Sequence, residues 1–275
     1  MRIRKDSPQT IRLKSRWHAF HNVKMRILIS NDDGIYSPGI AALAKVAARF
    51  GEVRIVAPDV EQSSMGHAIT ASRPLRYRRT PIAGVEAYRV NGTPADCVAL
   101  GAYHWQRVDL VLSGINLGLN LGNSCWHSGT LDAAKQAALL GIRAAALSMP
   151  VSDAEPDFTA LDPWIEQVIR CLVEEKTMSL VNVNFAEHPR GIRWTRQSVR
   201  HYDGKVVAAE DPQHRPVFWF TVVPLHETEE GTDRWAVDHE YVSLTPLRLD
   251  LTDEKLLRHA LAHHSSETTE SAPQS

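Results

Sequence analysis

Two adjacent carboxylates, Asp32 and Asp33, are the residues whose type and placement most strongly suggest chemistry. They follow the apolar run 27–29, and a helical pattern opens at Ser37, so they lie in a turn between a buried strand and a helix. Neighbouring carboxylates repel each other unless a cation or a proton compensates. The simplest such partner is a hard divalent metal ion held by oxygen ligands.

Two further polar loops follow the predicted strands 53–57 and 109–113. Because the carboxyl ends of parallel strands meet at one edge of a sheet, we expect both loops to lie beside the two aspartates. Carboxylate, hydroxyl and amide oxygens gathered there suit Mg²⁺ or Mn²⁺, whereas an Asp-Asp-Gly turn alone is usually only solvated. The loops offer Ser63, Ser64 and His67 in the first and Asn116, Asn120, Asn123, His127 and Ser128 in the second.

A helix predicted from Thr130 to Leu140 adds an anion site to this edge. Ser128 and Gly129 precede it, and the free N–H groups of a helix N-terminus preceded by glycine bind anions. A divalent cation beside an anion site is suited to phosphoryl chemistry. The sequence contains neither the GxGxxG dinucleotide fingerprint nor the GxxxxGK[ST] phosphate loop, so nicotinamide chemistry and ATP hydrolysis are not first choices.

The elements that must position these loops follow an α/β pattern. Between 25 and 149, short apolar runs alternate with amphipathic stretches, which predicts βαβ units and a mostly parallel sheet. A helix over 163–175 and a strand over 179–185 follow. From 191 to 246, aromatic residues and valines alternate with polar residues, which predicts a β-rich hairpin or arm, and 256–263 form a short terminal helix.

Composition limits the class of protein. The 275 residues carry a formal net charge of −1, which gives no global attraction to nucleic acid or to membranes. The three cysteines lie far apart and form no CxxC pair, which argues against a disulfide framework and favours a reduced, cytoplasmic setting. No apolar run approaches the ~20 residues that a membrane span needs.

The two ends of the chain differ from its middle. Residues 1–24 are polar, basic and aperiodic, and two interpretations stay open. Either translation starts at Met25 and the segment is a misannotated extension, or it is an arm for targeting or for nucleic acid. Residues 254–275 are expected to form the short helix and then a disordered tail.

Five motifs resemble those of the SurE nucleotidases, the stationary-phase survival protein family, and they occur along the chain in the family's order. The resemblance runs from Met25 to about Asp253, and the late stretches 211–219 and 241–247 also look like the family's C-terminal half. The motifs are Asn31-Asp32-Asp33-Gly34, Ala57-Pro58 with Gln62-Ser63, Asn91 to Val98, Ser113-Gly114-Ile115-Asn116 with Gly118, and Ser128-Gly129-Thr130.

The resemblance implies a Rossmann-like three-layer α/β sandwich over residues 25–253. A C-terminal arm within about 191–250 would be exchanged in a homodimer or homotetramer. It also implies a metal-dependent phosphomonoesterase acting on nucleoside 5′-monophosphates and sometimes 3′-monophosphates, with one divalent ion per subunit, Mg²⁺ or Mn²⁺. No nucleic acid polymer and no membrane is implied as a partner.

The site residues are carried over by motif. The implied metal ligands are Asp32, Asp33, Ser63 and Asn116, and the first two are also the catalytic residues. The implied phosphate-binding residues are Asn116, Ser128, Gly129 and Thr130.

Two departures from the family pattern stand out. Ser64 follows Ser63 where glycine is common, and His127 stands where tyrosine is common. The second change could alter substrate preference or place a titrating group beside the phosphate.

Two mechanisms stay open at this level. In one, water attacks phosphorus and Asp32 accepts its proton. In the other, Asp32 forms an aspartyl-phosphate. Two rival functions also stay open: a phosphatase of other phosphate esters or of polyphosphate, and a non-catalytic nucleotide-binding regulatory protein with the same fold.

Overall fold

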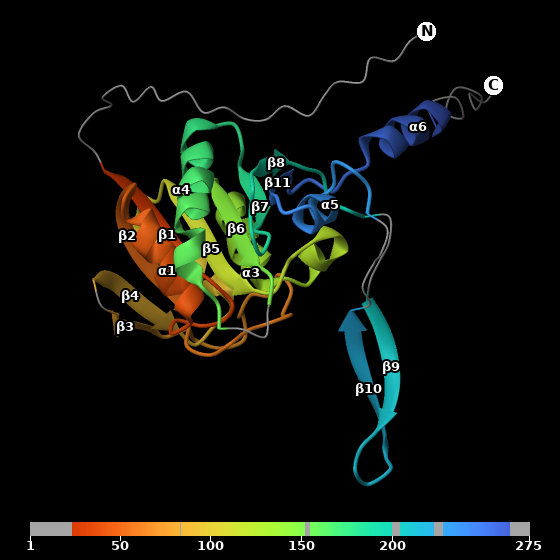
Figure 1. The fold of residues 1–275 in the computed structure, drawn as a ribbon, viewed down its shortest axis with the longest axis horizontal. Coiled ribbons are helices and arrows are strands. Elements are labelled where there is room, and N and C mark those ends of the chain that lie inside the picture. Colours follow the sequence, from red (N-terminus) through yellow and green to blue (C-terminus); the bar gives the residue numbers. More distant parts are fainter. Residues whose placement is uncertain (1–23, 83, 152–154, 200–203, 223–227, 265–275) are drawn as a thin grey trace, which may run out of the picture.

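A mostly parallel sheet forms the centre of the protein. The structure, a computed structural model, describes residues 24–82, 84–151, 155–199, 204–222 and 228–264. Within these residues one sheet has the strand order β3-β4-β2-β1-β5-β6-β7-β11-β8, and β9 pairs with β10 in a separate hairpin (Figure 1). The strands are β1 (Met25–Ser30), β2 (Gly51–Pro58), β3 (Tyr77–Ile82), β4 (Val85–Val90), β5 (Leu110–Leu117), β6 (Ala144–Met149), β7 (Leu180–Asn184), β8 (Ile192–Trp194), β9 (Gly204–Glu210), β10 (Pro216–Val222) and β11 (Val242–Leu247).

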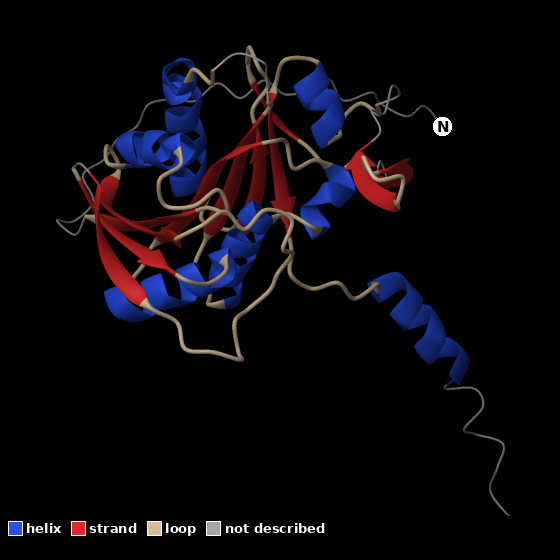
Figure 2. Ribbon diagram, turned by 90° about the horizontal axis from the view of Figure 1, so that it is seen from below, coloured by secondary structure: helices blue, strands red, loops and turns tan. Residues whose placement is uncertain are grey.

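Helices cover both faces of the main sheet, which gives three layers (Figure 2). One face packs against α1 and α4, and the other against α2 and α3. Strand β1 is buried on both faces, with the run 27–29 fully inaccessible, as expected for a central parallel strand. The predicted three-layer α/β fold is therefore confirmed. The helices are α1 (Pro38–Ala47), α2 (Pro94–Trp105), α3 (Gly129–Leu139), α4 (Phe158–Glu174), α5 (Asp233–Asp238) and α6 (Glu254–His264), with a 3₁₀ turn, η1 (Gly122–Trp126).

Local capping residues explain where the helices near the site begin. The Ser37 hydroxyl accepts a hydrogen bond from the Ile40 backbone N–H (3.4 Å), and Pro38 occupies the first helical position of α1. Thr93 and Asp96 form a reciprocal capping box at the start of α2. These starts agree with the positions predicted from the sequence.

Strand β5 is longer than the sequence predicted. The glycine at 114 suggested that the strand ended at Ser113, but pairing with β6 continues to Leu117 after a shift in register between Ser113 and Asn116. Ile115, inside the stretch predicted as loop, is fully buried. Asn116 therefore lies on a strand opposite Ser148 rather than in a free loop.

Helix α4 begins five residues before the predicted start at Pro163. Asp157 is its N-cap, since its side chain accepts hydrogen bonds from the backbone N–H groups of Thr159 and Ala160. The sequence prediction took the helix as an amphipathic stretch that starts at Pro163, and proline is favoured at the first helical position. Here the capping aspartate decides the start, and the proline lies inside the helix.

The region 191–246 is only partly the β-rich arm that its alternation suggested. Strand β11 pairs antiparallel with β7 and parallel with β8, so both join the main sheet. A short helix, α5, which was not predicted, is capped by Thr232. Only β9 and β10 form the separate hairpin (Figure 1). Strands β3 and β4 pair antiparallel as a further hairpin, which belongs to the main sheet.

Both predicted terminal segments fall largely outside the described residues. The extension at 1–23 and the tail at 265–275 lie there, whereas the terminal helix is present as α6. No helix in the described ranges is long and apolar enough to cross a membrane.

Candidate active site

The two aspartates lie at the carboxyl end of β1, between its parallel neighbours β2 and β5. Ser30, the last residue of β1, pairs with Ser113 of β5. Asp32 is only 4% exposed. The three strand ends therefore share one edge of the sheet, as the sequence predicted.

Asp32 packs against the N-terminus of α3. The Thr130 hydroxyl donates a 2.7 Å hydrogen bond to Asp32 Oδ1, and the Thr130 backbone also hydrogen-bonds to this carboxylate. A Cβ on Gly129 would lie 2.7 Å from the Asp32 Cβ, so only glycine fits there. Burial raises the pKa of Asp32, and the bonds from Thr130 oppose that rise. The helix N-terminus thus holds a buried carboxylate in place.

Asp33 is the carboxylate of this site that most needs a partner. Its Oδ2 is buried and makes no hydrogen bond within the described part of the chain. Burial, followed by the charges of Asp32 and Glu61, raises the pKa of Asp33 to about 7, although the Leu117 backbone hydrogen-bonds to it. Near pH 7 this group is therefore only about half ionised, and a bound cation would favour its ionised form.

Asn116 stands beside Asp33 on the end of β5, next to Leu117. Its Nδ2 donates a 2.7 Å hydrogen bond to the Gly118 carbonyl, which fixes the orientation of the amide. The side-chain oxygen receives no hydrogen bond from any residue that the structure describes. An oriented amide oxygen is a suitable ligand for a hard cation.

Ser63 contacts Glu61, an acidic residue close to the two aspartates. The backbone N–H of Gln62 donates to the Asp32 carbonyl (2.8 Å), which ties the loop after β2 to the turn after β1. The Ser63 hydroxyl, which is exposed, donates to Glu61 Oε1 (2.7 Å). Glu61 is close enough to raise the pKa of both Asp32 and Asp33. Ser63 thus lies on the outer rim of the site.

The remaining polar residues of these loops have other partners. His67 hydrogen-bonds to Gln136 (3.1 Å), Asn123 donates to the Val199 carbonyl (3.3 Å), and the His127 ring lies edge-on to Phe220 with centroids 6.4 Å apart. Ser128 caps α3 by accepting a bond from the Leu131 N–H (3.1 Å). Asn120 is buried within a network of asparagines rather than facing a cation.

Two acidic residues of the site were missed from the sequence. Glu61 stands two residues before Ser63 in the same loop, and Asp132 lies in the first turn of α3. Burial raises the pKa of Asp132 to about 6, with Lys135 opposing the shift and Asp32 adding to it. The position of Asp132 one turn from a helix N-terminus was the available signal.

The donor set fits a hard divalent cation rather than a softer metal. It consists of two carboxylates, an amide oxygen and a hydroxyl, and it includes the buried, unbonded Asp33 Oδ2. No group of three or more His, Cys, Asp or Glu side chains that could hold a metal occurs in the described residues. A thiolate or imidazole site is therefore not supported there, whereas an oxygen site completed by water is chemically suitable.

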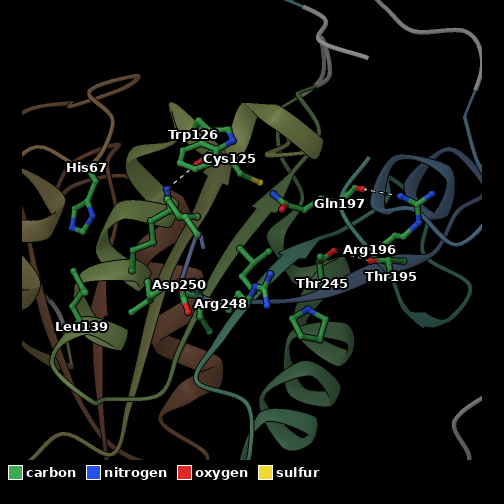
Figure 3. A pocket seen from close by; sticks show the side chains of 16 residues that line it. His67, Cys125, Trp126, Leu139, Thr195, Arg196, Gln197, Thr245, Arg248 and Asp250 are labelled. Atoms are coloured by element: carbon green, nitrogen blue, oxygen red, sulfur yellow. Dashed lines mark hydrogen bonds between the residues drawn. The ribbon is translucent and has the colours of Figure 1, made fainter. Parts of the chain in front are cut away.

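A large open pocket is lined by other residues than the two aspartates (Figure 3). Its volume is about 1040 Å³, and it runs past α3 toward the chain after β11. His67 and Trp126 line one part of it, and Arg248 and Asp250 line another. Neither aspartate, Ser63 nor Asn116 is among its lining residues, so this pocket is separate from the candidate site.

Comparison with known proteins agrees with the motifs and the geometry. The family model for Survival protein SurE matches residues 27–204, more than half of the chain. This chain belongs to the SurE family. Its relatives include 5′-nucleotidase SurE 1 of Thermus thermophilus, 50% identical over 234 residues, with 83% of this chain and 93% of the relative covered. Another is 5′-nucleotidase SurE of Deinococcus radiodurans, 42% identical over 245 residues, covering 86% and 91% of the two chains.

A solved SurE structure shows the same fold. The crystal structure of the SurE protein from Aquifex aeolicus superposes with a TM-score of 0.76 at 36% identity. The match covers 87% of this chain and 99% of that protein. The similarity therefore spans the SurE protein almost from end to end.

Proposed function

We propose that this SurE protein is a divalent-metal-dependent phosphomonoesterase that hydrolyses nucleoside 5′-monophosphates to nucleoside and phosphate. The observation that carries the proposal is a pair of adjacent aspartates: buried Asp32 packs against the N-terminus of α3, and half-buried Asp33 has one buried oxygen without a partner in the described part of the chain. Relatives that carry the name 5′-nucleotidase at up to 50% identity support the reaction class. Activity on 3′-monophosphates is a further expectation of the same proposal.

Four residues would hold the metal ion: Asp32, Asp33, Asn116 and, from the rim, Ser63. Mg²⁺ and Mn²⁺ both suit such oxygen donors. When bound, a divalent ion at such a site neutralises phosphate charge and lowers the pKa of water. Its charge also favours the ionised form of Asp33, whose pKa is otherwise raised to about 7 by burial and by the charges of Asp32 and Glu61.

Asp32 is the residue best placed to handle a proton in the reaction. Its raised pKa brings it closer to neutral pH, which suits a general base. Ser128 and Gly129, at the start of α3, would orient the phosphate oxygens near the helix N-terminus. Thr130 was predicted to bind phosphate as well, but in this structure its hydroxyl and backbone are engaged by Asp32. An aspartyl-phosphate on Asp32 is the alternative path.

The proposed function is tested by phosphate release from a panel of substrates. Nucleoside 5′-monophosphates, 3′-monophosphates, polyphosphate and a simple aryl phosphate are each incubated with Mg²⁺, Mn²⁺ or a chelator. We expect the highest kcat/KM with a nucleoside 5′-monophosphate and loss of activity in chelator. Equal rates with and without chelator would overturn the metal assignment. A clear preference for polyphosphate or the aryl ester would replace the substrate, and nucleotide binding without turnover would favour a regulatory protein.

We further propose that the protein assembles as a homodimer or homotetramer through the β9–β10 hairpin, in the cytoplasm. Phe218, Trp219 and Phe220 on this hairpin are 66–69% exposed. A lone two-stranded hairpin is marginally stable in water, so these aromatic side chains favour burial against a second copy. Light scattering tests the assembly: the native chain should exceed its 30.7 kDa monomer mass, and a Phe218→Ser/Trp219→Ser variant should not. A monomeric native chain would contradict this assembly.

A further inference from the structure

A buried asparagine, Asn120, is connected to Asp32 through one intermediate residue. Asn120 lies between β5 and η1 and is 8% exposed. Its Nδ2 donates hydrogen bonds to Thr130 Oγ1 (3.4 Å) and to Ser148 Oγ (2.8 Å). The Thr130 hydroxyl in turn donates to Asp32 Oδ1 (2.7 Å). A continuous path of side-chain hydrogen bonds therefore ends on the aspartate.

Strand β7 fixes the backbone of Asn120 from the other side. Asn184 both accepts from the Asn120 N–H (2.8 Å) and donates to its carbonyl (3.1 Å). Asn182 donates to the same carbonyl (2.7 Å). Both β7 side chains are fully buried. The Cys125 thiol also donates to this carbonyl (3.6 Å), so six hydrogen bonds hold one loop residue and give Asn120 a defined place.

The number of available protons sets the direction of the path. A threonine hydroxyl has a single proton, and Thr130 uses it on Asp32, so Thr130 can only accept from its other neighbour. An amide nitrogen has two protons, which Asn120 shares between Thr130 and Ser148. A carboxylate at position 120 would instead compete with Asp32 for the Thr130 proton. The amide nitrogen of Asn120 therefore keeps the Thr130 hydroxyl directed at Asp32.

We propose that Asn120 is a positioning residue that acts through Thr130 to hold Oδ1 of Asp32 in a hydrogen bond and so leaves Oδ2 for the reaction. This inference rests on the proposed function, because it assigns Asp32 a role in catalysis. In this account Asn182 and Asn184 of β7 hold the backbone of Asn120, and the side-chain amide of Asn120 acts on Thr130. It also explains why Asn120 does not face a cation.

A double-mutant cycle tests the path. The proteins are wild type, Asn120→Asp, Thr130→Val and the double variant, each assayed for kcat and KM with a nucleoside 5′-monophosphate. We expect Asn120→Asp to lower kcat about tenfold with KM changed less than threefold. In the Thr130→Val background the same change should cost less than twofold, because residues that act through a shared partner are not additive. Equal losses in both backgrounds, or wild-type kcat in Asn120→Asp, would overturn the proposal.

A matched control separates positioning from loss of a buried hydrogen bond. Ser243 is fully buried in β11 and hydrogen-bonds to Thr195 (2.8 Å), far from Asp32 in the strand order. Ser243→Ala should lower the melting temperature by a few degrees, as Asn120→Asp does, yet keep kcat. If Ser243→Ala loses as much kcat as Asn120→Asp, the effect is general destabilisation and the proposal fails. Asn120→Ser replaces Asn120→Asp if the latter does not fold.

Mn²⁺ binding on the same four proteins keeps this test separate from the proposed function. Wild type without phosphatase activity on any nucleotide would refute the function. The path would still predict non-additive changes in Mn²⁺ affinity, because Asp32 Oδ2 is the oxygen that it leaves available. Additive changes would overturn the path, and wild type that binds no Mn²⁺ would overturn both.

Discussion

The sheet edge around Asp32, called the rim below, and the β9–β10 hairpin differ in the kind of side chain that they bury or expose. At the rim, Asp32 and Asn120 are buried and each is fixed by a neighbour from another element, Thr130 on Asp32 and Asn184 on Asn120. On the hairpin, aromatic side chains are exposed and the two strands pair only with each other within the described residues. The rim holds polar groups away from water, and the hairpin presents apolar groups to it.

The difference indicates where each region finds its missing partner. Buried polar groups such as Asp33 Oδ2 need a charged or hydrogen-bonding ligand, because an unpaired buried group is costly. Exposed aromatic groups need another apolar surface. A small polar ligand for the rim and a protein partner for the hairpin follow from the same reasoning. The predictions below test whether the two regions are independent.

The largest expected effect comes from removing the charge of Asp32. Asp32→Asn should lower kcat by about 10²- to 10⁴-fold, the range typical of a positioned acid or base. The fold should survive, since asparagine is of the same size and can still accept the Thr130 hydrogen bond. Initial rates and a circular dichroism spectrum check both points. Near-normal turnover in this variant would rule out both water attack assisted by Asp32 and an aspartyl-phosphate.

A smaller effect is expected from adding one methyl group at Gly129. In Gly129→Ala the new Cβ would lie 2.7 Å from the Asp32 Cβ, so the carboxylate or the helix start must move. A shift of about 1 Å at a catalytic group can cost roughly 10²-fold in rate. Gly141→Ala is not a clean control because Gly141 has positive φ (75°). Ala138→Gly, farther along α3, is the better one, and it should keep kcat. Unchanged kcat in Gly129→Ala would mean that this contact does not position Asp32.

The pH dependence of metal binding should report on Asp33. Its pKa is raised to about 7 in the metal-free site, so below that pH a metal ion must displace one proton. Mn²⁺ affinity should therefore fall about tenfold per pH unit below pH 7 and level off above it. The sign follows from burial, which favours the protonated form and is offset by a bound cation. Asp33→Asn should bind weakly at every pH; a pH-independent affinity in wild type would contradict the assignment.

The smallest effect on turnover is expected from the hairpin. Trp219→Ser and Phe218→Ser should change kcat less than twofold, because both side chains are exposed and lie on the hairpin rather than at the strand ends that carry the aspartates. Ile29→Ala, directly behind the aspartates, provides the contrast, because deleting a fully buried side chain costs about 2–5 kcal/mol of unfolding free energy. Urea denaturation compares the two. A large loss of kcat in Trp219→Ser would show that the hairpin and the rim are coupled.

Local signals near the rim made the fold predictable from the sequence. The apolar run 27–29 and the helix opening at Ser37 each act over a few residues, and each was placed correctly. The failures needed long-range information. Strand β5 continues to Leu117 because it pairs with β6, and β11 joins the main sheet because it pairs with β7. Neither pairing can be seen in the local sequence.

The candidate site was predictable only in part for the same reason. Asp32, Asp33 and Asn116 were predicted as site residues because they stand next to strand ends, and the topology does bring these strand ends to one edge. Glu61 and Asp132 were missed, since their nearness to the aspartates depends on how a loop and a helix fold back. The role of Asn120 was also hidden, because its partners Asn182 and Asn184 lie more than sixty residues away.

The most direct test of the central claim is an anomalous-difference map from crystals of the native chain soaked in Mn²⁺. We expect one strong peak per chain, with Asp32, Asp33 and Asn116 oxygens within about 2.0–2.6 Å of it and Ser63 close by. The same soak of Asp33→Asn crystals should show a weaker peak or none. A peak in the pocket of Figure 3, or no peak beside Asp33 in the native chain, would contradict the account.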